Sequence, residues 1–340
     1  MGTNAAINFG VIGAGRIGRL HAENLATRLA GAEVRAIADV DQRAAQETAA
    51  QLRIPVATID YHEILEDNEI EAVAICSSTN THTQIIQEAA AAGKHIFCEK
   101  PIDFDLKKID AALQAVEKAG VQLQIGFNRR FDPNFRKVHD MVAAGKIGSP
   151  QILRITSRDP APPPIEYVRV SGGIFLDMTI HDFDMARYLM GSEVTEIFAA
   201  GGVMVDPKIG EAGDIDTAVI TLRFENGAIG TIDNSRQAVY GYDQRVEVFG
   251  SGGMVSAGND TADTHVYSNR EGVSSAKPLY FFLERYTESY IKEMQEFVEC
   301  IQSGSTPPVG GMDGRYPVVM GLAARRSFEE NRLVKMGEIE

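Results

Sequence analysis

Tryptophan is absent from this chain of 340 residues, and cysteine occurs only three times, as Cys76, Cys98 and Cys300. Three scattered cysteines are too few for a disulfide framework or a cysteine-rich zinc site, and this usage is typical of proteins in a reducing cytoplasm. The chain has no apolar run of the roughly 20 residues that a membrane-spanning helix needs. Its first residues also lack a basic start followed by an apolar signal core. We therefore expect a soluble protein of the cytoplasm with no membrane partner.

Positive charge is also scarce. The 33 Lys and Arg residues are outnumbered by 47 Asp and Glu residues, which gives a formal net charge of −14. An acidic chain of this kind does not favour nucleic acid or an anionic membrane surface as its main partner, because both require clustered basic residues. Hydrophobic residues make up 44% and charged residues 24%, an ordinary globular balance. The length suits two domains with sizeable cores.

Strand and helix patterns alternate through the first third of the chain, which predicts a parallel sheet covered on both faces. Short apolar runs typical of buried strands occupy 7–12, 33–39, 71–76, 94–98 and 121–125. Helical patterns follow them at 17–30, 42–52, 61–66, 81–92 and 106–119. We therefore predict an α/β domain over residues 1–125.

From residue 126 onward the pattern changes to long strand-like runs. Glu225-Asn226-Gly227 lies between two of them, and Asn-Gly is a strong hairpin signal; a second candidate turn is Gly250–Gly253. One helix is predicted around Phe175–Met190, and helices return at the end of the chain. These patterns predict an α+β domain over residues 126–340 with a large, mostly antiparallel, open sheet. The C-terminal helix, about 316–330, is a candidate to pack back on the first domain.

Residues 13–18 read Gly-Ala-Gly-Arg-Ile-Gly and match G-x-G-x-x-G directly after a predicted strand and at the start of a predicted helix. In this context Gly13 allows a tight turn, Gly15 lets a pyrophosphate approach the backbone, and Gly18 lets helix and strand pack closely. The helix N-terminus then offers free N–H groups to the phosphates. Asp39, at the end of the second predicted strand, can accept hydrogen bonds from an adenosine ribose and repels a 2′-phosphate. The motif and Asp39 together predict a Rossmann-type dinucleotide-binding domain that uses NAD rather than NADP.

Two other interpretations of this region stay open. Arg43 lies four residues after Asp39, and an arginine near that position can accommodate a 2′-phosphate. A G-x-G-x-x-G run by itself is also compatible with a glycine-rich turn that binds nothing. The strand, the helix and Asp39 in register favour the dinucleotide interpretation.

Three side chains are candidates for the chemistry. Lys100 belongs to Glu99-Lys100-Pro101 at the end of a predicted strand, where ligands of parallel sheets bind, and an ammonium there can stabilise an alkoxide. Asp177 and His181 are four residues apart in a predicted helix and would share one face. His181 can transfer a proton to or from an alcohol, because the ordinary pKa of histidine is close to neutral.

Plainer interpretations of these residues also exist. Lys100 fits an ordinary surface lysine, and the segment from Asp177 onward fits a helix start with acidic caps and a buried histidine. Asp177, His181 and Asp184 could instead bind a metal ion. No further clustered ligands accompany them, so we predict no metal site.

Five motifs together resemble those of a known family. They are Gly13–Gly18, Phe97–Pro101, Gly126–Asp132, Asp177–His181 and Tyr240–Asp243. Over essentially its full length the chain resembles the glucose–fructose oxidoreductase/inositol dehydrogenase (Gfo/Idh/MocA) family. The Glu-Lys-Pro and Asp-x-x-x-His motifs are typical of the whole family, whereas the Gly-Phe-x-Arg-Arg and Tyr-Gly-Tyr-Asp runs point to its bacterial inositol-oxidising members.

The resemblance implies NAD-dependent, metal-independent oxidation of the 2-hydroxyl of myo-inositol to 2-keto-myo-inositol. It implies that His181 removes the hydroxyl proton while hydride passes to C4 of the nicotinamide, with Lys100 and Asp177 binding the hydroxyls. It also implies a homotetramer assembled through the open face of the C-terminal sheet. The implied polyol contacts are Lys100, Asn128, Arg129, Asp159, Asp177, His181 and a tyrosine of the 240–242 pair, Tyr240. The implied NAD contacts are Gly13, Gly15, Arg16, Ile17, Gly18, Asp39, Arg43, Ser77, Thr79, Asn80, His82, Glu99 and Lys100.

Two positions depart from the inositol-oxidising pattern. Asn128 stands before the arginine pair where those enzymes carry methionine, and Ser157-Arg158-Asp159-Pro160 stands where they carry His-Arg-Asn-Pro. Both fall on implied substrate contacts, so scyllo-inositol or a pyranose sugar is an alternative substrate. A dinucleotide-binding sensor without catalysis is a further alternative, although intact Lys100, Asp177 and His181 argue against it.

Overall fold

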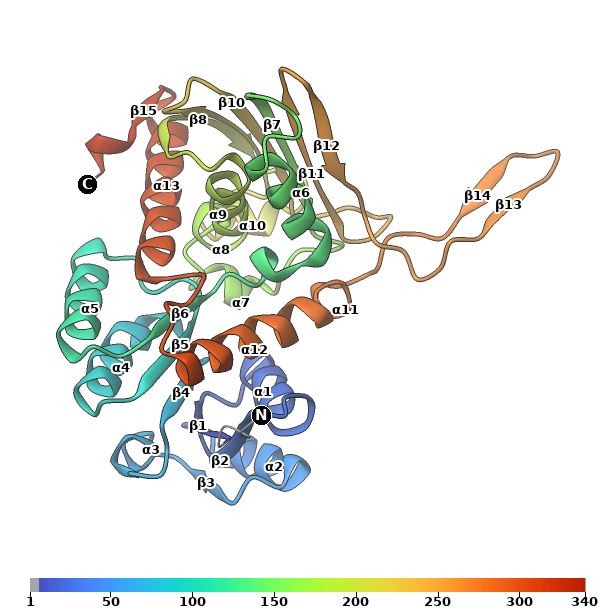
Figure 1. Ribbon diagram of the computed structural model, residues 1–340. Helices are drawn as coiled ribbons and strands as arrows, with labels where there is room; N and C mark the ends of the chain where they lie inside the picture. Colours follow the sequence, from blue (N-terminus) through green and yellow to red (C-terminus); the bar gives the residue numbers. More distant parts are fainter. Residues whose placement is uncertain (1–5, 340) are drawn as a thin grey trace. The chain divides into compact units, whose positions relative to one another are not determined.

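The computed structural model describes residues 6–339, and the chain folds into two compact units (Figure 1). Unit 1 extends to Asn128 and takes in the later segment Glu288–Tyr316. Unit 2 comprises Arg129–Thr287 and the residues from Pro317 onward. The chain therefore passes from one unit to the other three times.

Unit 1 is built on a six-stranded sheet in the order β3-β2-β1-β4-β5-β6, and every pair of neighbouring strands is parallel. Its strands are β1 (Ile7–Ile12), β2 (Ala32–Ala38), β3 (Val56–Thr58), β4 (Ala72–Ile75), β5 (His95–Glu99) and β6 (Leu123–Gly126). Its helices include α1 (Arg16–Glu23), α2 (Gln42–Leu52), α3 (His62–Glu66), α4 (Thr79–Ala91) and α5 (Leu106–Ala119). The predicted α/β class is confirmed. The strand order reverses between β1 and β4, and ligands of open parallel sheets bind beyond the carboxyl ends of the strands at such a point.

Two local features of unit 1 differ from the prediction. The edge strand β3 was missed, because three residues are too few to show an alternating pattern. The helix expected over 17–30 is α1, which begins one residue earlier and passes into a π-helical turn at Asn24–Arg28.

The core of unit 1 is completed by a helix from far along the chain, α12 (Thr287–Ser303). Phe297 of this helix packs against Phe9 of β1 and Phe97 of β5, with ring centroids 6.2 Å apart in both pairs. Two further residues of α12 join the same buried cluster, Met294 and Val298.

This arrangement corrects the expected domain division. The helix near 316–330 was the candidate to join the first domain, but the segment that joins unit 1 is Glu288–Tyr316. The long helix α13 (Gly311–Glu330) changes unit at Pro317 and continues in unit 2. Both C-terminal helices have apolar faces, and the periodicity of a sequence does not show which core such a face will join.

Unit 2 is built on a seven-stranded sheet in the order β12-β11-β7-β10-β9-β8-β15. All neighbouring pairs are antiparallel except β7 and β10, so the predicted mostly antiparallel sheet is confirmed, as are both predicted hairpins. The strands are β7 (Pro150–Arg158), β8 (Val194–Gly202), β9 (Thr217–Phe224), β10 (Ile229–Ser235), β11 (Asp243–Gly250), β12 (Gly253–Ala257) and β15 (Val334–Lys335). The helices are α6 (Pro133–Ala143), α7 (Ile165–Val168), α8 (Ile174–Asp177), α9 (Thr179–Met190), α10 (Pro207–Glu211), α11 (Phe282–Arg285) and most of α13.

The helix predicted around Phe175–Met190 is in fact two helices, α8 and α9, separated by a single residue. Thr179, the first residue of α9, directs its hydroxyl to Oδ1 of Asn234 on β10, 2.6 Å away, which ties the start of α9 to the sheet. Asp177 therefore ends one helix and His181 lies in the first turn of the next. The four-residue rule for a shared helical face does not apply across this junction.

One face of the unit 2 sheet is covered and the other is open. Helices α6 and α9 contact β7, β10, β11 and β12 on the covered face (Figure 1). Along β9 every second residue is buried and the residues between are mostly exposed, as a half-covered strand requires. Four large apolar side chains are exposed on the strands of this sheet, namely Val219, Ile229, Phe249 and Met254.

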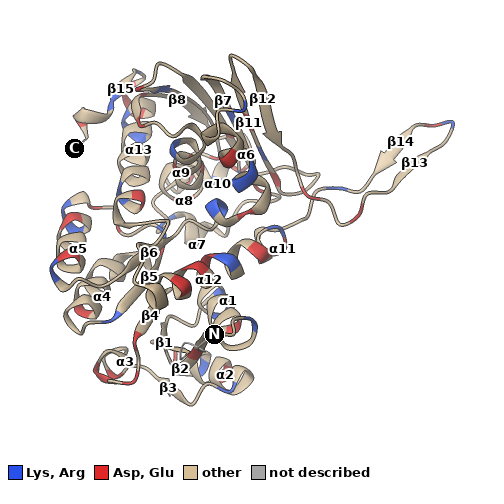
Figure 2. Ribbon diagram, in the orientation of Figure 1, with Lys and Arg blue, Asp and Glu red and all other residues tan. Residues whose placement is uncertain are grey.

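A separate two-stranded hairpin, β13 (Val266–Ser268) and β14 (Val273–Ser275), projects from unit 2 (Figure 1). Every residue from 261 to 275 is exposed. Figure 2 shows acidic and basic residues interspersed along α5 and α12. Within residues 6–339, no helix has the length and apolar character needed to cross a membrane.

Candidate active site

The glycine-rich loop joins β1 to α1 beside the end of β4. Gly13 has a φ of +105°, which glycine adopts readily, and a Cβ there would lie 2.5 Å from the Cys76 carbonyl oxygen. A Cβ on Gly18 would lie 1.9 Å from the Gly13 carbonyl oxygen. Both glycines are therefore required by the fold of unit 1 itself.

Gly15 differs, because no part of the described chain requires glycine there. Its φ is −69°, which any residue adopts, and an added Cβ would meet nothing within 4 Å. Gly15 is the N-cap of α1, where backbone N–H groups lack partners within the helix. The choice of glycine is explained if the phosphates of a ligand approach the backbone at this point.

Asp39 directly follows β2 and is held against the glycine loop. Its Oδ2 accepts a hydrogen bond from the Ala14 backbone N–H (2.6 Å) and its Oδ1 accepts one from the Asp41 N–H (2.8 Å). The side chain of Arg43 is 84% exposed and donates to Glu47 on the next turn of α2 (2.6 Å). Asp39 is thus fixed in place beside the loop, whereas Arg43 is paired along its own helix.

Of the predicted NAD contacts after β4, three lie at the start of α4 beside the glycine loop, and the fourth, His82, is buried. Ser77, Thr79 and Asn80 lie at the junction of β4 with α4, next to the glycine loop in the sheet order. His82 is 1% exposed, with Nδ1 2.9 Å from the Pro101 carbonyl oxygen and Nε2 3.1 Å from that of Ser77. Burial lowers the pKa of His82. This geometry gives His82 a structural role that links two loops, and its contact with NAD stays a prediction.

Glu99 and Lys100 leave the carboxyl end of β5. Glu99 Oε1 lies 2.7 Å from Nε2 of His21, which is fully buried on α1. Glu99 is therefore anchored inside unit 1, while Lys100 is half-buried at the ligand-binding edge of the sheet. The Lys100–Pro101 peptide bond is cis.

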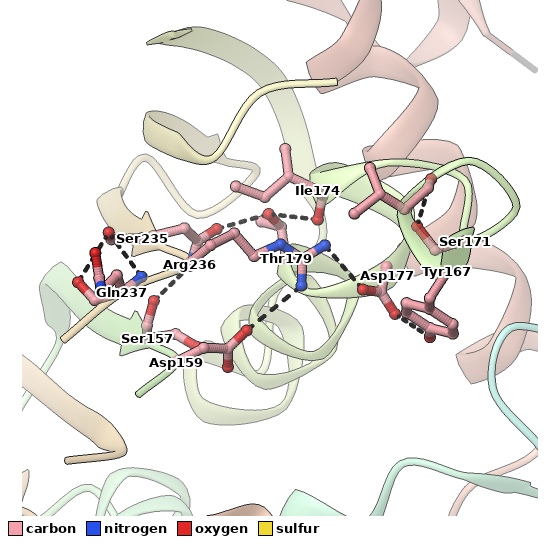
Figure 3. A network of polar contacts seen from close by, with 12 residues as sticks. Ser157, Asp159, Tyr167, Ser171, Ile174, Asp177, Thr179, Ser235, Arg236 and Gln237 are labelled. Carbon is pink, nitrogen blue, oxygen red and sulfur yellow. Dashed lines mark hydrogen bonds and ion pairs between the residues drawn. The ribbon is translucent and has the colours of Figure 1, made fainter. Parts of the chain in front are cut away.

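Asp177 is held by two neighbours in unit 2 (Figure 3). Its Oδ1 accepts a hydrogen bond from the Tyr167 hydroxyl (2.7 Å), and its Oδ2 accepts one from Nη2 of Arg236 (2.8 Å). Nη1 of the same guanidinium lies 3.4 Å from Oδ2 of Asp159. His181 is half-buried in the first turn of α9. Two predicted site residues, Asp159 and Asp177, are thus joined through one arginine.

The charges of this network depend on one another. Burial raises the pKa of Asp159, Arg236 opposes that shift, and Asp177 adds to it. Burial works against the charge of Arg236, but Asp177 and Asp159 raise its pKa above the ordinary value for arginine. Burial and Asp177 raise the pKa of Tyr167, so its hydroxyl stays protonated and able to donate.

The arginine pair after β6 forms buried ion pairs with α9. Nη1 of Arg129 lies 2.6 Å from Oδ1 of Asp182, and Arg130 holds Asp184 through Nε (3.0 Å) and Nη2 (2.6 Å). Burial raises the pKa of Asp182, and Arg129 opposes the shift. Because Arg130 engages Asp184, the alternative metal site loses one of its proposed ligands. No cluster of three metal-ligating side chains occurs within the described residues.

Family models match the chain in both units. A model described as an oxidoreductase family with an NAD-binding Rossmann fold matches residues 7–127, and a GFO/IDH/MocA C-terminal domain matches residues 135–256. The chain belongs to the Gfo/Idh/MocA oxidoreductase family. The resemblance inferred from the motifs is confirmed, and unit 1 is the NAD-binding domain of a family member.

Three relatives show what is known of such proteins. The myo-inositol 2-dehydrogenase of Thermotoga maritima is 53% identical over 98% of this chain and 99% of its own length. The crystal structure of a putative myo-inositol dehydrogenase from Sinorhizobium meliloti is 43% identical with a TM-score of 0.93, and the match covers 97% of this chain and 100% of that one. The crystal structure of scyllo-inositol dehydrogenase from Lactobacillus casei with bound NAD(H) and scyllo-inositol is 30% identical with a TM-score of 0.92, covering 98% of this chain and 99% of that one.

The family's cofactor fits the glycine loop of this member. The open space at Gly15 and the fixed carboxylate of Asp39 match what a pyrophosphate and an adenosine ribose require. Gly13 and Gly18 allow the close backbone approaches within the loop, and Arg16 and Ile17 are the first two residues of α1.

Substitution of Gly15 by valine should weaken NADH binding and leave stability unchanged. We expect an increase in Kd of about 10- to 100-fold, equivalent to roughly 1–3 kcal/mol of steric conflict with the phosphates. The melting temperature should stay near the wild-type value, because the added Cβ would meet no atom of the described chain within 4 Å. Fluorescence titration with NADH and thermal unfolding measure the two effects.

Gly18→Ala is the matched variant with the opposite expectation. Its Cβ would conflict with the Gly13 carbonyl, so the melting temperature itself should fall. Wild-type NADH affinity in Gly15→Val would show that the phosphates do not pass over Gly15.

Two predicted polyol contacts take positions that the sequence did not foresee. The Tyr240 hydroxyl donates to Oδ2 of Asp243 (2.6 Å), and the tyrosine is 40% exposed. Tyr242 is 7% exposed, and its hydroxyl lies 3.5 Å from Nη2 of Arg129. Tyr242 is therefore the tyrosine of the pair that lies beside Arg129. Asn128 is 2% exposed, and its amide Nδ2 has no partner within the described residues.

Tyr167 and Arg236 were missed by sequence reasoning. Both contact Asp177, from 10 and 59 residues away along the chain. Neither lies in a motif, and a lone arginine after a predicted strand has no pattern that separates it from a surface residue. Arg236 carried one usable signal, its position directly after a strand pattern whose last three residues are all polar, namely Asp233, Asn234 and Ser235.

Proposed function

We propose that this protein oxidises the 2-hydroxyl of myo-inositol to 2-keto-myo-inositol with NAD as the hydride acceptor. The observation that carries the proposal is the 53% identity, over 98% of the chain, with the myo-inositol 2-dehydrogenase of Thermotoga maritima. The sequence keeps Lys100, Asp177 and His181, the three residues that this chemistry needs. A sensor without catalysis has no use for all three.

The proposed roles follow from the chemistry of each side chain. Bound NAD accepts hydride at C4 of its nicotinamide. Neutral His181 accepts the hydroxyl proton, because alcohol oxidation releases one proton for each hydride. Lys100 stabilises the developing alkoxide with its positive charge. Asp177 is positioned to accept hydrogen bonds from neighbouring polyol hydroxyls.

The main alternative substrate is scyllo-inositol. It is favoured by the full-length match to the Lactobacillus casei scyllo-inositol dehydrogenase and by the departures at Asn128 and Asp159. Purified protein should be assayed with myo-inositol, scyllo-inositol and D-glucose, with NAD or NADP, in the presence of a chelator. Highest kcat/KM with myo-inositol and NAD supports the proposal, and highest kcat/KM with scyllo-inositol favours the alternative. Failure of every polyol to reduce either cofactor overturns the dehydrogenase proposal.

Cofactor choice should depend on Asp39. In the wild type, kcat/KM should be higher with NAD, because a 2′-phosphate would lie against the carboxylate held at the glycine loop. Asp39→Ala should bring the NAD and NADP values closer together, whereas Arg43→Ala should have a small effect, since Arg43 is paired with Glu47. Equal use of the two cofactors by the wild type would contradict this prediction.

The open sheet face should be covered by other copies of the chain. Val219, Ile229, Phe249 and Met254 place exposed apolar surface on its strands, and closed symmetric assembly would bury such surface. We expect a homotetramer with about four times the 37.0 kDa mass of the chain in light scattering. Phe249→Glu should reduce that mass, and a wild-type monomer at micromolar concentration would refute the assembly. A cytoplasmic location is part of the same proposal, supported by three cysteines that are all free.

A further inference from the structure

We propose that Arg236 is a positioning residue that holds Asp177 and Asp159 as a fixed pair of ionised carboxylates at the polyol-binding end of unit 2. This inference rests on the proposed polyol oxidation, in which Asp177 binds hydroxyls. It adds Arg236 and Tyr167 to the residues on which the reaction depends. Arg236 and Asp159 are brought together by a feature of the sheet that the sequence did not predict, the parallel pairing of β7 with β10.

The parallel pair places Arg236 and Asp159 side by side. Ser235 of β10 is aligned with Arg158 of β7, so the next residue of each strand leaves the sheet at the same edge. The Asp159 N–H donates to the Ser235 carbonyl oxygen (2.9 Å), which extends the pairing by one step. An antiparallel neighbour would have placed the end of one strand beside the start of the other.

Arg236 is buried and is held at both ends. Its side chain is 4% exposed, and its backbone N–H donates to the Asp216 carbonyl oxygen (2.8 Å). Nη2 reaches Asp177 and Nη1 reaches Asp159, so one guanidinium contacts two carboxylates from different segments. A buried arginine is costly to desolvate unless it is paired, and here the pairing is with acidic groups that were themselves predicted to bind substrate.

Tyr167 restricts the rotation of the Asp177 carboxylate. Its hydroxyl occupies Oδ1 while Arg236 occupies Oδ2, so the two oxygens are held from opposite sides by different residues (Figure 3). Rotation of the carboxylate would break at least one of these hydrogen bonds. The Asp177 carboxylate would therefore already be oriented when it accepts hydrogen bonds from polyol hydroxyls. Such preorganisation favours turnover, because no reorientation is needed during the reaction.

The electrostatic surroundings make Arg236 the decisive cation. The acidic groups near its guanidinium are Asp177 on α8, Asp159 after β7 and Asp214 before β9. Arg129 is the other cation that acts on Asp159, and its Nη1 is already paired with Asp182. Without Arg236, the partly buried carboxylates of Asp177 and Asp159 would lose the cation that contacts both of them, with Asp214 close by. Such a group takes up a proton at a higher pH than a paired carboxylate does.

The test compares Arg236→Gln with Arg236→Lys, Tyr167→Phe and a matched control, Arg187→Gln. Arg187 also forms an ion pair in unit 2, with Glu193 at 2.6 Å, in which the arginine side chain is 10% and the glutamate side chain 40% exposed. Its Nε and Nη2 both donate to Glu193, and not to Asp177 or Asp159. Circular dichroism and NADH titration first establish that each variant is folded and that unit 1 is intact. The polyol dependence of kcat and KM is then measured across pH.

We expect Arg236→Gln to lower kcat/KM by about 10- to 100-fold, the range for loss of a hydrogen bond to a charged group. In the wild type the acid limb of the kcat/KM profile reflects protonation of His181. In Arg236→Gln protonation of the carboxylate pair should add to it, so the acid limb should steepen and move to higher pH, because a protonated pair cannot accept hydroxyls. Arg236→Lys should restore the position of the acid limb in part, since it keeps the charge. Tyr167→Phe should lower kcat/KM without moving the acid limb. A profile for Arg236→Gln that matches Arg187→Gln overturns the proposal.

A second measurement does not depend on catalysis. Carboxyl carbons of aspartate can be labelled with carbon-13 and titrated by NMR in the wild type and in Arg236→Gln. The proposal expects at least one aspartate to protonate at higher pH in the variant, and identical titrations would overturn it. Should the wild type oxidise no polyol, the dehydrogenase proposal would fail, while this titration would still decide whether Arg236 keeps the carboxylates ionised.

Discussion

Replacing His181 with alanine is expected to lower kcat by about 10²- to 10⁴-fold, the usual contribution of a general base. The reaction releases a hydride and a proton, and His181 is the titratable side chain in the Asp-x-x-x-His segment that can accept that proton near neutral pH. NADH affinity should change little, because the glycine loop and Asp39 belong to unit 1 and His181 belongs to unit 2.

The pH dependence gives this variant a second readout. In the wild type, kcat should fall as pH decreases through the pKa of the base, because the protonated imidazole cannot accept a proton. His181→Ala should lose that limb, and added imidazole should restore part of the rate. The control is His265→Ala, because His265 is 63% exposed in the hairpin region of unit 2. A His181→Ala enzyme with near wild-type kcat and an unchanged pH profile would show that another group is the base.

Replacing Lys100 with alanine should damage both turnover and polyol KM. The ammonium is placed at the carboxyl end of β5, where it can bind a hydroxyl in the ground state and the alkoxide in the transition state. Loss of both contacts should lower kcat/KM by about 10²- to 10³-fold. Steady-state kinetics with myo-inositol at saturating NAD measure the effect.

Two other lysines of unit 1 serve as controls for this variant. Lys107 is exposed at the start of α5, so Lys107→Ala should behave like the wild type. Lys94 is 5% exposed and donates to the carbonyl oxygens of Asp67 and Ile70, so Lys94→Ala should lower stability without a specific effect on KM. If Lys100→Ala lowers stability but leaves kcat and polyol KM unchanged, the prediction is wrong and Lys100 has a structural role, as Lys94 does.

The parts of this site that the sequence predicted are those whose partners are set by local geometry. The glycine loop and Asp39 follow consecutive strands of a βαβ unit, and that unit alone brings Asp39 to the Ala14 N–H. The hairpin at Asn226-Gly227 is equally local, because the turn residues themselves select the pairing of β9 with β10.

The parts that were missed depend on pairings between distant segments. Arg236 contacts Asp159, 77 residues earlier in the chain, because β7 and β10 are parallel. No turn or motif in the sequence predicts the pairing of these two strands. The sequence likewise contains no sign that the ring of His82 lies between two carbonyl oxygens, those of Pro101 and Ser77. The sequence predicts the strand or helix in which, or next to which, a residue such as His82 or Arg236 lies. The direction of its side chain depends on tertiary packing, which the sequence pattern does not show.

The contribution of α12 to unit 1 bears on how this protein is made. When the ribosome has synthesised residues up to Asn128, all six strands of the nucleotide-binding sheet have been made, yet Phe297 has not. At typical synthesis rates the missing helix follows about 10–30 s later. During that interval the apolar surface around Phe9 and Phe97 is left uncovered in the nascent chain. A gene fragment that ends at Asn128 would make this exposure permanent, so the nucleotide-binding unit is not a portable module of the polypeptide.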